Sequence, residues 1–169
     1  HNGREETTTM TLIPQVRKAT SLPLIAAGGI ASGEAMLAAM ALGAEGVQCG
    51  TVFAMSKESS ASEAFKQRCT ELQEGDTMLC LKKIAPTRLI KNQLYDNIKD
   101  AEDNGANADE LRTIIGKAAS KRGIFEGDLN DGELEIGQIA SGIKEIQTAG
   151  EIIKRMVGEF EETKKRIIG

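Results

Sequence analysis

The sequence predicts an α/β fold, built from short buried strands that end in glycine and alternate with helices. The first predicted strand covers residues 24–27 and is followed by Gly28-Gly29, and the second covers residues 46–50. Both are almost wholly apolar, as in parallel strands covered on two faces. Because such alternation is typical of the (β/α)8 barrel, we expect the C-terminal part of a TIM barrel with an additional, mostly helical lobe.

Composition limits the classes of function. The 169 residues are 40% hydrophobic and 27% charged, which indicates a folded globular chain. A net charge of −4 argues against general nucleic-acid binding. The longest apolar run, residues 22–27, is too short to span a bilayer, and no signal peptide is visible. Three cysteines without CxxC spacing are typical of a protein of the reducing cytoplasm. The sequence has no cluster of metal-ligating residues, so we expect no transition-metal site.

The sequence opens at His1, without an initiator Met, in what resembles the middle of a loop. Two parallel strands cannot close a barrel. We therefore expect the C-terminal part of a longer polypeptide, with further strands supplied by an absent segment, a second chain or a rearranged pairing. The expected organisation is the last barrel strands and helices in 1–72, a helical cap in 73–147, and a C-terminal helix in 148–169 that packs back on the barrel.

Capping and spacing patterns predict the remaining elements. A helix should follow the N-cap candidates in residues 7–9, and Ser32 should cap a second helix that stops at Gly43. A capping box, Thr148 with Glu151, should open the last helix. The other expected elements are a helix ending near residue 69, a strand over 78–81, a long helix from Pro86 through Ile90, Leu94 and Ile98, a helix over 109–120, a loop over 123–132 and a helix over 136–146.

The two glycine turns are the candidate site. Backbone N–H groups of Gly28, Gly29, Gly50 and Thr51 would suit a phosphate, because no side chain blocks its close approach. The alternative is a pair of ordinary strand-to-helix turns. Gln48 is polar within an apolar strand, so we expect its amide to be buried and paired with a phosphate-bearing cofactor or its phosphate, a water molecule or a backbone carbonyl.

Six segments together have the pattern of a known family. They are Ala26–Ala31, Leu42–Thr51, His1–Gly3, Thr8–Leu12, Arg88–Leu94 and Gly137–Ala140. The chain resembles the FMN-dependent nitronate monooxygenase (2-nitropropane dioxygenase) family and its relative, bacterial enoyl-acyl-carrier-protein reductase II. Ile136 stands where the family's late Ala-Gly-Gln loop has alanine. The resemblance runs over nearly the whole chain, but over only about the C-terminal half of the family's barrel.

The resemblance implies a flavin oxidoreductase with FMN at the barrel mouth. In the reductase, NADH or NADPH provides electrons and the substrate is an enoyl thioester on acyl carrier protein. In the monooxygenase, a small nitronate is oxidised with O2. For the fragment alone, an inactive piece that needs its missing segment is the further alternative. A homodimer is compatible with the resemblance, whereas no nucleic-acid or membrane partner is expected.

The resemblance also implies roles for individual residues. His1 would lie near the reactive face of the flavin, as a base, a proton donor or a substrate-orienting group; the alternative is a frayed terminus. Gly137 and Gln138 would approach the flavin ring or close the pocket, or simply start a helix. Arg88 and Lys91 would meet an anionic cofactor or the carrier protein, or form a solvated helix face.

Overall fold

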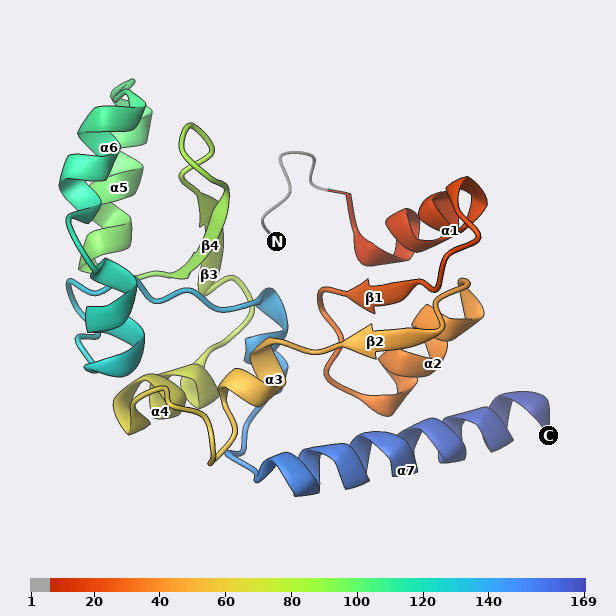
Figure 1. Cartoon of the computed structure of the whole chain (residues 1–169). Helices are drawn as coiled ribbons and strands as arrows, with labels where there is room; N and C mark the ends of the chain where they lie inside the picture. Colours follow the sequence, from red (N-terminus) through yellow and green to blue (C-terminus); the bar gives the residue numbers. More distant parts are fainter. Residues whose placement is uncertain (1–6) are drawn as a thin grey trace.

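The computed structural model describes residues 7–169 and contains a two-stranded parallel sheet. β1 (Ile25–Ala27) runs parallel to β2 (Gly46–Gln48), with Ala27 opposite Gln48. Both arrows in Figure 1 end on the side that faces the green part of the chain. The α/β class predicted from the sequence is confirmed.

Two helices flank this sheet. α1 (Thr9–Ala19) precedes β1, and α2 (Gly33–Ala41) connects the strands. The Ser32 hydroxyl accepts from the N–H of Ala35 at 3.3 Å, and Gly43 follows α2 with φ +109°. The predicted cap and stop of this helix are both confirmed.

α7 (Ala149–Ile168) packs along α2 and covers the sheet from below in Figure 1. Ile152 and Met156 of α7 are buried in one cluster with Ala26 of β1 and Ala39 of α2. The approach is closest at Gly33, where a Cβ atom would lie 2.2 Å from the backbone nitrogen of Phe160. A residue without a side chain is therefore required where these two helices meet.

A second hydrophobic cluster joins the sheet region to the rest of the chain. It contains Met55, Phe65, Leu72, Leu134 and Ile136, among others. The elements around it are α3 (Thr51–Ala54), α4 (Glu63–Glu71), the short π-helix η1 (Lys121–Phe125) and the 3-10 helix η2 (Gln138–Gly142).

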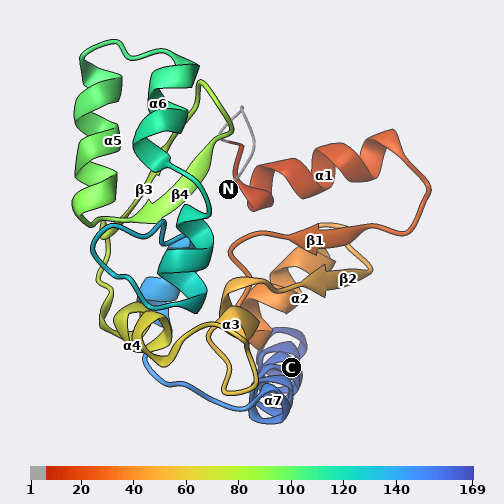
Figure 2. The same cartoon turned by 60° about the vertical axis from the view of Figure 1, so that its left-hand side comes forward.

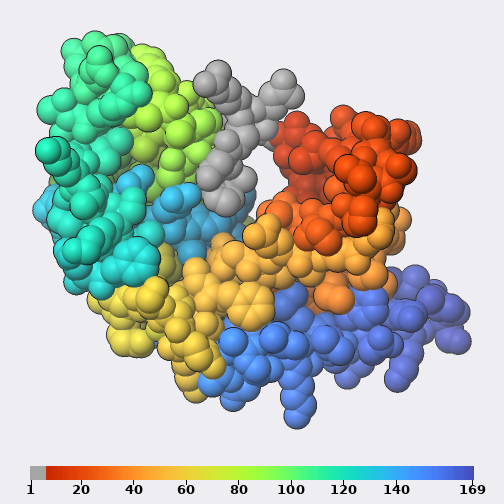
Figure 3. Space-filling view, viewed as in Figure 1, coloured from red at the N-terminus to blue at the C-terminus, as the bar shows by residue number. Residues whose placement is uncertain are grey.

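Residues 77–115 form a unit that we call the cap lobe. β3 (Thr77–Cys80) pairs antiparallel with β4 (Thr87–Ile90), and α5 (Gln93–Asp103) and α6 (Ala108–Ile115) pack on each other. Figures 1 and 2 both place the cap lobe beyond the C-terminal ends of β1 and β2. Figure 3 shows α1 and the cap lobe on opposite sides of the same face of the molecule.

The long helix expected from Pro86 was wrong, because its first turn is the strand β4. Leu89 and Ile90 are both buried, and residue 89 bridges to Glu135 on the side opposite β3. The helix starts only at Gln93, where the Asn92 side chain accepts from the N–H of Tyr95 at 2.9 Å. Apolar spacing alone did not separate a buried strand from the first turn of a helix.

Two further helices are shorter than expected. α6 ends at Ile115 because Gly116 adopts φ +72°, a left-handed conformation that stops a helix. In place of the helix over 136–146 there is only η2. Arg88, expected on a helix face, lies on β4 and donates to the carbonyl of Thr77 at 3.1 Å.

Within residues 7–169, no helix combines the length and the apolar character needed to cross a lipid bilayer.

Gly33→Ala should lower the free energy of unfolding by about 2 kcal/mol, because the added methyl group overlaps the α7 backbone. Gly158→Ala is the matched control within α7. Its Cβ would meet no atom within 4 Å, so it should stabilise the protein by roughly 0.5–1 kcal/mol. Urea unfolding of both variants measures the difference, and equal stabilities would contradict the packing described here.

The capping box should make stability depend on pH. The backbone N–H and the hydroxyl of Thr148 both donate to Glu151, and these bonds lower the pKa of its carboxyl group. A lowered native pKa stabilises the fold above the unfolded-state pKa, and this contribution is lost as pH falls through the native value. Glu151→Gln should thus be less stable than the parent at pH 7, with a smaller deficit at about pH 3. Glu161→Gln, exposed on the same helix, is the matched control, and urea unfolding of both variants at the two pH values measures the difference.

Candidate functional site

The parallel register brings the two glycine turns to the same edge of the sheet. Because Ala27 lies opposite Gln48, Gly28-Gly29 and Gly50-Thr51 both leave the sheet at that edge. Gly28 has φ +110° and Gly29 has φ +72°, conformations that residues with side chains rarely adopt. The structure thus joins four of the predicted site residues in one place.

The donors of these turns are unpaired within residues 7–169. There the N–H groups of Gly29, Gly50 and Thr51 have no acceptor, and a Cβ atom at Gly29 or Gly50 would meet nothing within 4 Å. Open space beside unpaired backbone donors is the arrangement that binds a phosphate group. A cofactor with a terminal phosphate therefore fits the residues present.

Gly137 is attached directly to this edge, although 86 positions separate it from Thr51. Its N–H donates to the Thr51 hydroxyl oxygen at 3.2 Å. A Cβ atom at residue 137 would lie 2.4 Å from that oxygen, so only glycine fits. Because the hydroxyl acts as an acceptor here, its proton remains available to a ligand.

The remaining predicted residues are less well placed. Gln48 is exposed, so its expected burial was wrong: beside a two-stranded sheet, this side chain at the end of β2 needs no buried partner. Gln138 is exposed at the first position of η2. His1 lies outside the described residues.

Sequence reasoning missed Thr9, whose hydroxyl donates to the carbonyl oxygen of Gly28 at 2.8 Å. The local pattern identifies the three consecutive threonines only as N-cap candidates. The N-cap is Thr8, whose side chain makes no capping bond, and this leaves the next threonine to hold the turn. A contact across 19 residues left no local signal in the sequence.

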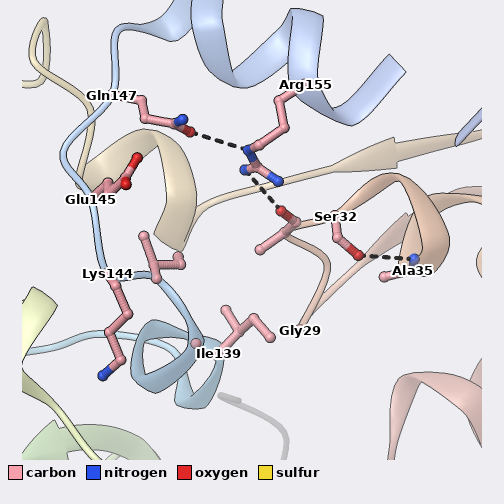
Figure 4. Close-up of a pocket in the computed structure, with 11 residues that line it drawn as sticks. Gly29, Ser32, Ala35, Ile139, Lys144, Glu145, Gln147 and Arg155 are labelled. Atoms are coloured by element: carbon pink, nitrogen blue, oxygen red, sulfur yellow. Dashed lines mark hydrogen bonds between the residues drawn. The ribbon is translucent and has the colours of Figure 1, made fainter. Parts of the chain in front are cut away.

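A cavity of about 360 Å³ lies on the α7 side of the turn. Figure 4 shows Arg155 above it, bonded to Gln147, with Ser32 nearby. Of the predicted site residues, only Gly29 lines it. Two of the three charged side chains that line it already have partners: Arg155 pairs with Glu159, and Lys144 donates to the carbonyl of Leu72, while Glu145 is the third. The cavity borders the glycine turn without offering a free charge from these two side chains.

The cysteines do not provide a thiolate. Burial raises the pKa of the Cys49 thiol, which lies beside Gly50. Burial also raises the pKa values of Cys69 and Cys80 to about 12. All three thiols stay protonated at neutral pH, so a nucleophilic role is disfavoured.

Comparison with known proteins identifies the family of the chain. The family model for nitronate monooxygenase matches residues 1–159. A probable nitronate monooxygenase from Staphylococcus saprophyticus is 35% identical over 119 residues, which cover 68% of this chain and 34% of that protein. The chain therefore spans about a third of the length of this curated relative.

Two solved structures extend the comparison to three dimensions. FabK from Thermotoga maritima superimposes with a TM-score of 0.91 at 34% identity, covering 98% of this chain and 52% of that one. Nitroalkane oxidase from Streptomyces ansochromogenes gives a TM-score of 0.74 at 28% identity, covering 94% of this chain and 45% of that one. With its glycine turns at one edge of a parallel sheet and the family model matching nearly its whole length, the chain belongs to the nitronate monooxygenase family.

Proposed function

We propose that the complete protein is an FMN-dependent oxidoreductase and that this chain forms the C-terminal part of its (β/α)8 barrel. The observation that carries the proposal is the pair of glycine turns at one edge of the sheet, whose N–H groups at Gly29, Gly50 and Thr51 have no acceptor among residues 7–169. In barrels of this type, phosphates bind at the loops after the last strands. Membership of the nitronate monooxygenase family supports FMN as the phosphate-bearing group.

Gly28, Gly29, Gly50 and Thr51 would hold the FMN phosphate through backbone N–H groups and one hydroxyl. When bound, FMN supplies hydride-transfer chemistry, and the protein supplies position and electrostatics. Gly137, fixed to Thr51, would bring the start of η2 to the cofactor.

Two site roles rest on the resemblance seen in the sequence, those of Gln138 and His1. Gln138 would approach the flavin ring or close the pocket. Gln48, at the end of β2, would pair with the flavin or its phosphate. The side chain of His1 would orient the substrate or exchange a proton near the flavin, since imidazole titrates near neutral pH. Each role is a proposal for the complete protein.

The favoured reaction is reduction of an enoyl thioester on acyl carrier protein with electrons from NADH or NADPH. Its support is the sequence resemblance to enoyl-acyl-carrier-protein reductase II and the close match in structure to FabK. The second candidate, oxidation of a small nitronate with O2, is favoured by the name of the family and by its curated members. A cytoplasmic location and a homodimer complete the proposal.

Thr51→Val should weaken FMN binding to the complete protein about tenfold, the scale of one lost hydrogen bond to a charged group. Thr51→Ser is the matched control, because it keeps the hydroxyl group. Quenching of flavin fluorescence on titration measures both affinities. Equal binding by the valine variant and the parent would remove Thr51 from the phosphate site.

The two candidate reactions differ in what consumes the electrons. For the reductase, anaerobic NADH or NADPH should bleach the flavin absorbance of the complete protein, and an enoyl thioester should restore it. For the monooxygenase, a nitronate should drive O2 uptake without a nicotinamide. Failure of both nicotinamides to bleach the flavin, together with nitronate-dependent O2 uptake, would replace the first candidate by the second.

A further inference from the structure

Two side chains of α7 hold the segment that follows the Gly28-Gly29 turn. The Arg155 guanidinium donates through Nη2 to the carbonyl oxygen of Ala31 at 3.2 Å. The Glu159 carboxylate accepts from the N–H of Gly33 through Oε2 at 2.8 Å. These contacts cross 124 and 126 positions of the sequence.

Arg155 and Glu159 also fix each other. Arg155 Nη1 lies 2.9 Å from Glu159 Oε1 and 3.1 Å from Oε2, and Arg155 Nε donates to the side-chain oxygen of Gln147 at 3.1 Å. The two side chains are 31% and 28% exposed, so their pairing is only partly screened by solvent. With its three nitrogens all engaged, Arg155 is held as a rigid fork rather than left free for a ligand.

The turn is held from its other side by Thr9, whose hydroxyl donates to the carbonyl oxygen of Gly28. Fixed carbonyls at residues 28 and 31 leave only Gly29 and Ile30 between them. Because a glycine at φ +72° has many alternative conformations, those two anchors determine where the Gly29 N–H points.

The Gly33 contact gives these anchors little freedom to move. α2 and α7 approach so closely there that no Cβ atom fits, and the Glu159 bond lies at the same residue. Displacement of α7 would therefore shift Ala31 and Gly33 together. A helix outside the glycine turns thus contacts the segment that directly follows Gly28-Gly29.

We propose that Arg155 and Glu159 are positioning residues, which act through Ala31 and Gly33 to aim the Gly29 N–H at the phosphate of the flavin. This inference rests on the proposed FMN site. It gives the α7 ion pair a role in selecting a phosphorylated flavin over one that lacks a phosphate.

The test compares FMN with riboflavin, which shares the ring but has no phosphate. In the complete protein, Arg155→Met should weaken FMN binding about tenfold, as expected for one lost charge-assisted contact, while riboflavin affinity changes less than about twofold. Arg155→Lys should lie between the parent and the methionine variant, because one charged nitrogen can replace only part of the contacts that the guanidinium makes. Lys154→Met, the adjacent exposed position of α7, is the matched control and should leave both affinities unchanged.

A second measurement covers variants that bind flavin too weakly to titrate. Amide hydrogen exchange over residues 28–36 in the ligand-free protein should be faster in Arg155→Met than in Lys154→Met. Glu159→Gln should show a smaller increase, because its amide oxygen still accepts from the N–H of Gly33.

The outcomes separate the positioning role of Arg155 and Glu159 from the cofactor site. Equal loss of FMN and riboflavin affinity, or unchanged exchange over residues 28–36, would overturn the positioning role and leave the FMN proposal intact. A parent protein that binds riboflavin as tightly as FMN would overturn the phosphate site itself. The positioning role of Arg155 and Glu159 would then be overturned as well.

Discussion

The parallel pairing of β1 with β2 is the constraint on which the rest of the site depends. Parallel strands send their carboxyl ends to the same edge, so two turns separated by about twenty residues of chain become neighbours. The connection between them must be a crossover, and α2 is that crossover. Slippage of the pairing by one residue would reverse which side chains face the core, and the burial of Ala26 between two exposed neighbours opposes it.

Burial at the ends of α2 converts this pairing into a fixed local geometry. Ser32 caps its N-terminus, and Gly33 packs directly against α7. At the other end, Gly43 stops the helix, and the chain continues into β2. The second cluster, around Phe65 and Ile136, then places η2 beside α3. The bond from Gly137 to Thr51 is the local result of that packing.

Much of this was predictable from short-range patterns. The strand–glycine–helix order, the cap at Ser32 and the box at Thr148 each depend on residues close in sequence, and all were expected correctly. The helix from Pro86 was not, because pairing of residue 89 with Glu135 decides in favour of a strand, and that contact spans 46 positions. The expected burial of Gln48 was wrong for a similar reason: its exposure depends on which segments surround the sheet rather than on its neighbours in the strand.

The site residues that the sequence did not reveal share one property: each acts from far along the chain. Thr9 reaches Gly28 from α1, and Arg155 reaches Ala31 from α7. The length of the second reach has a consequence for biosynthesis. Arg155 is translated 124 residues after Ala31, so a nascent chain on the ribosome carries the glycine turn long before the arginine that steadies it. The finished shape of that turn therefore forms only after α7 has been synthesised.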